Sequence, residues 1–384
     1  MEVKQIYELM NTVTGEILGE SSLVQEDLQN ITDIGTQILN ATAFDNYVRT
    51  LVNHIGRVIF VNRPYSGNIP SVLMDSWEFG SIMEKITAEL PEATENESWE
   101  LTDGASYDPN IFYKPTVSAK FYNKRVTFEV PVSITERQVK ESFSNSAQLN
   151  GFISMIYNAV DKSMTVKIDS LVMRTINSMI GETIKADFGS ANLNSKSGIK
   201  AVNLLYLYNQ QFNKSLTAGD ALTDPDFIRF ASYNMGIYAS RLTKLSTLFN
   251  IEGKDRFTPS DLLHVVMLSD FKKACAVYLQ SDTFNKELVA LPNAEEVPYW
   301  QGSGTDYAFS NVSKINIVTP SGDAVEASGI LGVMFDRDTL GVCCQNRKVT
   351  TNYNPKAEFT NSWFKFECGT FADRAENFVV FFVA

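Results

Sequence analysis

The sequence predicts an α+β fold, because segments with the period of strands and segments with the period of helices are grouped along the chain. Strand-like patterns occur before residue 135 and again after Val312, and the strongest helical pattern lies between them. The chain has 384 residues, 44% of them hydrophobic, which is enough apolar surface for a substantial core. At roughly 100 to 200 residues per domain, this length predicts two or three domains.

Charge and cysteine content exclude several classes of protein. There are 33 Lys plus Arg against 45 Asp plus Glu, a net charge of −12, which opposes general affinity for phosphate backbones and disfavours a DNA reader. The cysteines at 275, 343, 344 and 368 have no C-x-x-C spacing. Neither a zinc ribbon nor a secreted disulfide framework fits, and a reducing cytoplasm is expected.

Hydropathy predicts a soluble protein. The longest apolar run, Phe378 to Ala384, is far shorter than the ~20 residues that span a bilayer, and the N-terminus lacks a secretory signal. Residues 1–56 are polar and rich in Asn, Thr and Gln, which indicates either a frayed terminus or an arm that orders against another surface.

The next segment, residues 57–135, ends in a predicted β-hairpin. Val126 to Ile134 alternates apolar and polar residues, as does Val117 to Phe121, and Tyr122 to Lys124 is expected to form the turn. Pro115 and Pro131 each remove a backbone donor, so the hairpin is expected to be a free ribbon or an edge, or else an ordinary peripheral hairpin. Its apolar face needs cover from this chain or from another molecule.

A long helix follows, predicted over about residues 148 to 180 by apolar residues at intervals of three and four. Gly181 and Gly189 are the first stop signals. Thr223 and Pro225 predict the cap and first turn of a later helix, and Ser269 a cap for a helix beginning at Asp270.

Strands are predicted through the rest of the chain. Leu262 to Leu268 is too continuously apolar for a one-sided strand and indicates a buried one. The final segment, Phe378 to Val383, is expected to be an inner strand, because left unpaired it would be prone to aggregation. The intervening strands are predicted at 315–318, 330–335, 341–344, 347–351 and 363–367.

Catalytic patterns are weak. Ser260 and His264 would lie about 13 Å apart on a strand, which is out of proton-transfer reach. Asp336 and Asp338 are interpreted as a turn, because no third ligand for a cation is spaced nearby. Phosphate-loop, dinucleotide, hydrolase-elbow and zincin motifs are missing, and adjacent Cys343 and Cys344 are interpreted as packing residues. No cofactor or metal is expected.

Basic and aromatic residues gather on the predicted hairpin. In an acidic protein we interpret these cations as partners for carboxylates on a neighbouring subunit. The candidate inter-subunit contacts are Lys114, Lys120, Phe121, Lys124, Arg125 and Phe128.

The order of these segments resembles the major capsid protein of tailed bacteriophages, whose shell fold is shared with encapsulins and the herpesvirus capsid floor. The resemblance is carried by the extended segment Val58 to Thr135, the long helix Leu149 to Ile180 and the tail Met334 to Ala384. The tail, which begins MFDRDTLGVCCQNRKVTTNYNPKAEFTNSWFKFECGTF, looks like that of short-tailed phages of the phi29 type. LLHVVMLSDFKKACAVYLQ and VPYWQGSG look like the core of the axial domain.

The resemblance implies an N-terminal arm (1–56), an extended loop (57–135), a peripheral domain (136–190 and 336–384) and an axial domain (191–335). It implies a structural subunit, not an enzyme, that self-assembles as pentamers and hexamers into an icosahedral or prolate head around double-stranded DNA. The implied partners are a scaffolding protein and a portal, with assembly in the host cytoplasm and a final location in the virion.

Three alternatives remain at this point. One is an encapsulin-like cargo compartment, and another is a tail or fibre protein, which the lack of internal repeats disfavours. The third, from another class, is a hydrolase or transferase using Asp336, Asp338 and His264.

Overall fold

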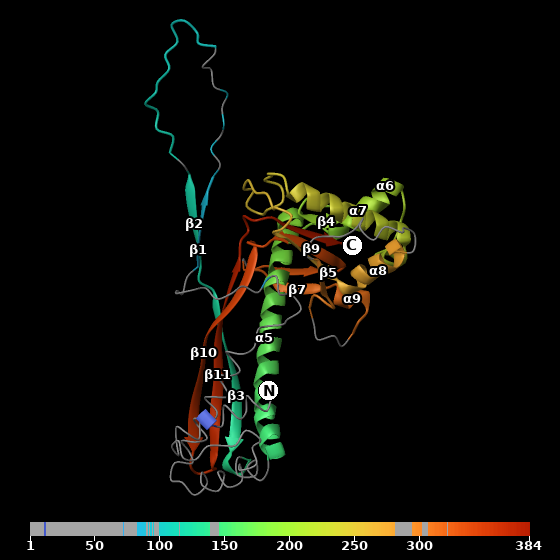
Figure 1. Cartoon of the computed structure of the whole chain (residues 1–384). Coiled ribbons are helices and arrows are strands. Elements are labelled where there is room, and N and C mark those ends of the chain that lie inside the picture. The colour runs from blue at the N-terminus through green and yellow to red at the C-terminus, as the bar shows by residue number, and fades with distance from the viewer. Residues whose placement is uncertain are drawn as a thin grey trace. The chain divides into compact units, whose positions relative to one another are not determined.

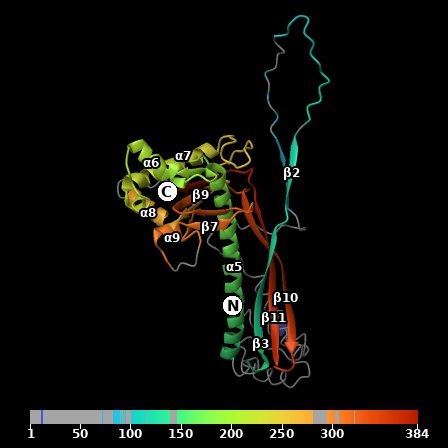
Figure 2. The same cartoon turned by 180° about the vertical axis from the view of Figure 1, so that it is seen from behind.

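The computed structural model describes residues 11–12, 72, 83–89, 91, 93, 95, 100–114, 116–138, 146–280, 294–301, 306–320 and 322–384. Figures 1 and 2 show its helices and strands from opposite sides. The predicted N-terminal arm lies outside these residues, apart from Asn11 and Thr12. Among the helices that are described, none combines the length and apolarity needed to cross a membrane.

The chain divides into two compact units. The first comprises residues 1–76, 125–175 and 342–369, and the second comprises 77–124, 176–341 and 370–384. These boundaries differ from those of the four regions implied by the capsid resemblance, which concern the assembled shell and stay a prediction.

The first unit contains a three-stranded sheet in the order β10-β11-β3. Antiparallel pairing of β11 with β3 runs from Phe359 opposite Thr135 to Gly369 opposite Arg125. β3 is therefore an edge strand, as Pro131 predicted. The strands are β3 (Arg125–Thr135), β10 (Leu340–Asn354) and β11 (Phe359–Ala372).

The predicted hairpin between Tyr113 and Ile134 is wrong in its pairing. β2 (Val117–Tyr122) pairs with an earlier strand, β1 (Met83–Ala88), and not with β3. The residues predicted to form a turn instead join two strands that belong to different sheets. Alternation shows that a segment is a strand, but it carries no information about which distant segment supplies the partner.

The long helix is confirmed and is longer than predicted. α5 (Ser146–Phe188) has 43 residues and continues through Gly181. Both figures draw its first half along the sheet of β3, β10 and β11. Most residues from Leu171 to Ile184 are buried, and this packing outweighs the low helix propensity of one glycine. The helix ends at Gly189, whose φ of 59° is left-handed and whose N–H donates to the Lys185 carbonyl at 2.8 Å.

Cys344 and Cys368 form a disulfide that links β10 to β11. This corrects the prediction that Cys344 is a packing residue, whereas Cys343 is free and buried. Spacing along the chain did not reveal the pair, because strand pairing brings together residues 24 positions apart.

The second unit is built on a five-stranded mixed sheet in the order β4-β12-β9-β5-β6. β12 is buried at every position, lies parallel to β4 and runs antiparallel to β9, so the predicted inner strand is confirmed. The predicted buried strand at 262–268 is β5, which lies between β9 and β6. The strands are β4 (Ala201–Asn203), β5 (Leu263–Leu268), β6 (Ala294–Val297), β9 (Ile330–Asp336) and β12 (Phe378–Phe382).

Helices and a small two-stranded sheet complete this unit. Side chains from the helices and from β5, β9 and β12 form one hydrophobic core that includes Phe227, Met235 and Phe381. The remaining elements are α6 (Leu204–Phe212), α7 (Pro225–Leu242), α8 (Ser269–Gln280), α9 (Phe309–Val312), β7 (Ile315–Val318) and β8 (Ala324–Ala327).

Two predicted helix caps are wrong. The N-cap of α7 is Asp224, whose side chain accepts from the N–H groups of Asp226 and Phe227, although Pro225 does begin the helix. Ser269 is itself the first residue of α8, and its hydroxyl donates to the Val297 carbonyl at 3.0 Å. In α7 the aspartate directly before Pro225 caps the helix in place of the threonine one residue earlier.

Candidate assembly surface

The ribbon of β1 and β2 is a candidate interaction surface. Its two strands pair over six positions, from Met83 opposite Tyr122 to Ala88 opposite Val117. One further backbone bond, from the Glu89 N–H to the Thr116 carbonyl at 2.9 Å, extends the ladder. Figure 1 shows residues 100–114 as an open loop beyond the two strands. A two-stranded ribbon is marginal in water by itself, so this one needs support.

The two faces of the ribbon differ in chemistry. Directly opposed residues share a face, so Ala119 lies beside Ile86 and Val117 beside Ala88 on one face. The other face carries Lys85 opposite Lys120.

The apolar face is the more exposed one. Ile86, Val117 and Phe121 are exposed, whereas Lys120 and Tyr122 on the opposite face are partly buried. Among the described residues, eight of the nineteen exposed large hydrophobic side chains lie between Ile86 and Phe121. Phe112 and Tyr113 are the extreme cases, at 83% and 81% exposed. Such a concentration of exposed apolar side chains is typical of an interaction surface.

The polar face of the ribbon is attached to its own unit by ion pairs. Lys85 Nζ lies 2.9 Å from Asp373 Oδ2 and 2.8 Å from Glu376 Oε1. Lys120 Nζ lies 2.9 Å from Asp373 Oδ1 and 2.6 Å from Glu252 Oε2. We call Lys85, Lys120, Glu252, Asp373 and Glu376 the ribbon-base cluster.

Burial and charge act in opposite directions on the ionisable groups of this cluster. Burial would raise the pKa of Asp373, but the hydrogen bond from Lys120 and the ion pair with Lys85 outweigh it and hold that pKa at about 2. Burial would lower the pKa of Lys85, yet its bonds to Glu376 and Asp373 raise it. Each group is therefore held in its charged form.

The six predicted contact residues divide into two groups. Lys114, Phe121 and Lys124 are exposed. Lys120 is paired within the ribbon-base cluster, and Arg125 Nη1 lies 2.9 Å from Glu367 Oε1.

Phe128 completes the second group, because its ring packs in a tilted arrangement against that of Phe366, with 5.2 Å between the centroids. The carboxylates expected from a neighbouring copy are thus partly supplied by this chain. The sequence analysis did not identify Phe112 as an exposed contact residue or Asp373 as the acid that pairs with the lysines. The many aromatic residues of this segment were a signal for Phe112.

The residues of the enzymatic alternative do not converge. In the pairing of β5 with β9, His264 is opposite Phe335 and Leu263 is opposite Asp336. His264 and Asp336 therefore point to opposite faces of the sheet. The Asp338 N–H donates to Asp336 Oδ1 at 2.9 Å, which confirms that the D-x-D sequence forms a turn. In the described part of the chain, no three His, Cys, Asp or Glu residues are grouped to hold a metal.

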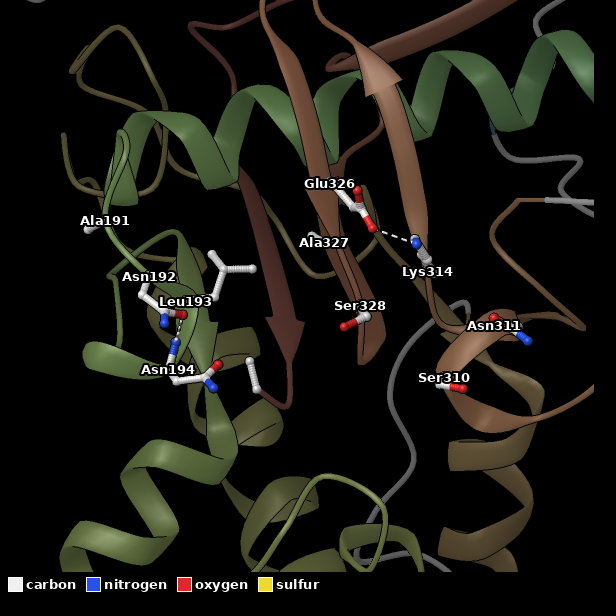
Figure 3. Close-up of a pocket in the computed structure, with 11 residues that line it drawn as sticks. Ala191, Asn192, Leu193, Asn194, Ser310, Asn311, Lys314, Glu326, Ala327 and Ser328 are labelled. Atoms are coloured by element: carbon white, nitrogen blue, oxygen red, sulfur yellow. Dashed lines mark hydrogen bonds and ion pairs between the residues drawn. The ribbon is translucent and has the colours of Figure 1, made fainter.

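A polar pocket of about 610 Å³ lies in the second unit. Figure 3 shows Asn192 and Asn194 at one side and the ion pair of Lys314 with Glu326 toward the other. Lys314 Nζ is 2.5 Å from Glu326 Oε1, so these two charges neutralise each other. The lining contains neither His264 nor Asp336, so this pocket does not hold the residues of the enzymatic alternative.

The fold is that of phage capsid proteins. The capsid of Staphylococcus phage Andhra matches with a TM-score of 0.51 and 9% sequence identity, covering 84% of this chain and 86% of that chain. A structure from bacteriophage P68 has a TM-score of 0.49 at 10% identity, covering 84% and 86%. The mature capsid of bacteriophage PhiM1 has a TM-score of 0.42 at 9% identity, covering 84% and 89%. No curated protein matches the sequence significantly.

The class is therefore a structural subunit of a phage shell. The chain belongs to the family of Phi29-like phage major capsid proteins, which its sequence matches over residues 10–382. It assembles with copies of itself into the shell of a phage head and is located in the virion. The predicted α+β class and the predicted capsid function are confirmed.

Proposed function

We propose that the ribbon lies on a neighbouring copy of this chain in the shell and buries its apolar face there. The observation that carries this proposal is the asymmetry of the ribbon: its lysine face is paired within its own unit, and its apolar face is exposed. Burial of apolar area at about 25 cal/mol per Å² favours a second surface as cover. Shell contacts of ~800 Å² per partner are an appropriate size for such a ribbon and its loop.

The predicted contact residues have two roles in this proposal. Phe121 joins the apolar contact, while Lys114 and Lys124 meet carboxylates of the neighbouring copy. Lys120, Arg125 and Phe128 support the surface through their contacts within the chain.

Membership of the capsid family supports a proposal for the wider assembly. In this proposal the subunits form pentamers and hexamers in the host cytoplasm, with a scaffolding protein and a portal, and the head encloses double-stranded DNA. The four regions are the N-terminal arm, extended loop, peripheral domain and axial domain. A net charge of −12 supports weak contact with DNA, because few cations are available to phosphates. The subunit has no enzymatic role, and the geometry of His264 and Asp336 supports this.

The test replaces the two most exposed aromatic residues of the loop. The double variant Phe112→Ser, Tyr113→Ser removes apolar area that no described residue of the chain covers. We expect it to fold normally and to fail to form shells in negative-stain microscopy and sedimentation. The matched control is Tyr233→Ser on α7, where an equally large side chain is 69% exposed outside the ribbon. Shells of unchanged yield from the loop variant would contradict the proposal.

A further inference from the structure

The pairing of β1 with β2 creates an electrostatic problem. Lys85 and Lys120 are directly opposed on the same face. Like charges at opposed positions destabilise a strand pair, and a two-stranded ribbon has little stability to spare. Something outside the ribbon has to neutralise both lysines for this register to persist.

One carboxylate does this for both strands. Asp373 Oδ1 accepts a hydrogen bond from Lys120 on β2, and Asp373 Oδ2 lies 2.9 Å from Lys85 on β1. The aspartate is held by its own backbone surroundings, because Oδ1 also accepts from the Ala375 N–H at 3.0 Å. Its N–H donates to the Thr339 carbonyl at 2.8 Å. Its position is thus set by the turn between β11 and β12 and not by the ribbon.

Two other acids complete the cluster but hold one strand each. Glu376 binds Lys85 and also accepts from Arg256 Nε at 3.0 Å, and Glu252 binds Lys120. The exposed fractions of the three acidic side chains rank them: 1% for Asp373, 10% for Glu376 and 35% for Glu252. Exposed ion pairs contribute little, whereas removing one partner of a buried pair leaves an uncompensated charge. Asp373 is therefore the residue on which both strands depend.

We infer that Asp373 is a positioning residue for shell assembly: it holds both strands of the ribbon by their lysine face and so keeps the apolar face available to a neighbouring copy. This inference rests on the proposed function of the ribbon. The two lysines complete this contact, because each ammonium nitrogen lies 2.9 Å from a different oxygen of the same carboxylate. Without this contact the ribbon is free to turn its apolar face onto its own chain.

The experiment compares Asp373→Asn, which is nearly isosteric, with Glu252→Gln, which removes only the exposed partner of Lys120. Amide hydrogen exchange in β1 and β2 is measured on the unassembled chain, and shell yield is measured by sedimentation. For Asp373→Asn we expect exchange about tenfold or more faster in the ribbon and a similar loss of shell yield, since a buried pair is broken. Glu252→Gln is expected to change both by less than about threefold.

Two double variants of the lysines test the same inference if Asp373→Asn fails to fold. Lys85→Arg with Lys120→Arg keeps both charges and is expected to retain assembly, whereas Lys85→Gln with Lys120→Gln is expected to lose it. Exchange rates in α7 and β5 report whether the rest of the unit is folded.

The outcomes separate this inference from the proposal on which it rests. If Phe112→Ser, Tyr113→Ser still forms shells, the proposed function fails, while fast exchange in Asp373→Asn would still show that the aspartate holds the ribbon. If that loop variant fails to assemble but Asp373→Asn keeps slow exchange and full yield, the inference is overturned.

Discussion

Asp373 shows how one residue keeps its charge in a buried place. Its side chain is 1% exposed, yet Lys85 and Lys120 hold its pKa at about 2, below the ordinary 3.8. The folded state therefore releases this proton more readily than the unfolded chain does. Its contribution to stability is present above about pH 4 and is lost as the pH falls toward 2.

This predicts a pH-dependent difference between two chains. At pH 6 the wild-type chain should exceed Asp373→Asn in free energy of unfolding by on the order of 2 kcal/mol, and the difference should shrink toward pH 2. Urea unfolding at several pH values measures it, and the comparison cancels the titration of the other carboxyl groups. A difference in unfolding free energy that stays constant between pH 6 and pH 2 would contradict the lowered pKa of Asp373.

Gly329 offers a second test at the residue scale. Its φ is +77°, and a Cβ there would lie 1.9 Å from the backbone oxygen of Val383. Gly322 also has a positive φ, +89°, but a Cβ there meets no atom within 4 Å. We expect Gly322→Ala to cost about 1 kcal/mol and Gly329→Ala several times more, because only the second combines strain with a clash. Thermal unfolding measures the loss of stability in both variants. Equal losses would show that the backbone of Val383 does not obstruct a side chain at position 329.

At the scale of elements, the link between β10 and β11 is covalent as well as hydrogen-bonded. The Cys344–Cys368 disulfide closes a loop with a sequence separation of 24. Closing a loop of that length lowers the entropy of the unfolded chain and is worth about 3 kcal/mol. The structure thus contains a stabilising contact whose presence depends on the redox state of its surroundings.

We expect a thiol reductant to lower the urea midpoint of the wild-type chain. The double variant Cys344→Ser, Cys368→Ser should unfold at the lower midpoint with or without reductant. Cys275→Ser is the matched control, because Cys275 is a free thiol, and it should respond to reductant as the wild type does. An effect of reductant on the double variant would show that another group is responsible.

At the scale of the whole molecule, net charge governs how copies approach one another. Each subunit carries −12, so long-range repulsion opposes association. Raising ionic strength from about 0.01 M to about 0.15 M shortens the Debye length from about 30 Å to about 8 Å. The ion pairs of buried Asp373 within the ribbon-base cluster are screened much less than the exposed charges.

We therefore predict that salt promotes shell formation. The protein concentration at which half the chains sediment as shells should fall several-fold over that range of ionic strength, while exchange in the ribbon stays unchanged. Sucrose at equal osmolarity is the control, since it screens no charge. If added salt raised that concentration instead, attraction between oppositely charged surfaces would dominate assembly.

Sequence reasoning was most successful where the decisive forces are local. The apolar period of α5, the continuous apolar strands β5 and β12 and the edge position of β3 at Pro131 were all predicted, and the structure confirms them. The order of these elements along the chain also predicted the capsid family, which the match over residues 10–382 confirms.

It failed where distant segments have to meet. The partners of β2 and β3 come from residues 83–88 and 359–372, and nothing in residues 117–135 specifies either. The same limit hid the disulfide and the role of Asp373, since each depends on residues that are remote along the chain.

Period, propensity and composition act over a few residues, so the sequence by itself determined the class of fold, the nature of its main elements and the kind of protein. Tertiary structure alone decided which face of the ribbon is held and which is free. That choice depends on a buried carboxylate more than 250 residues from the two lysines, and only the folded chain brings those charges within bonding distance.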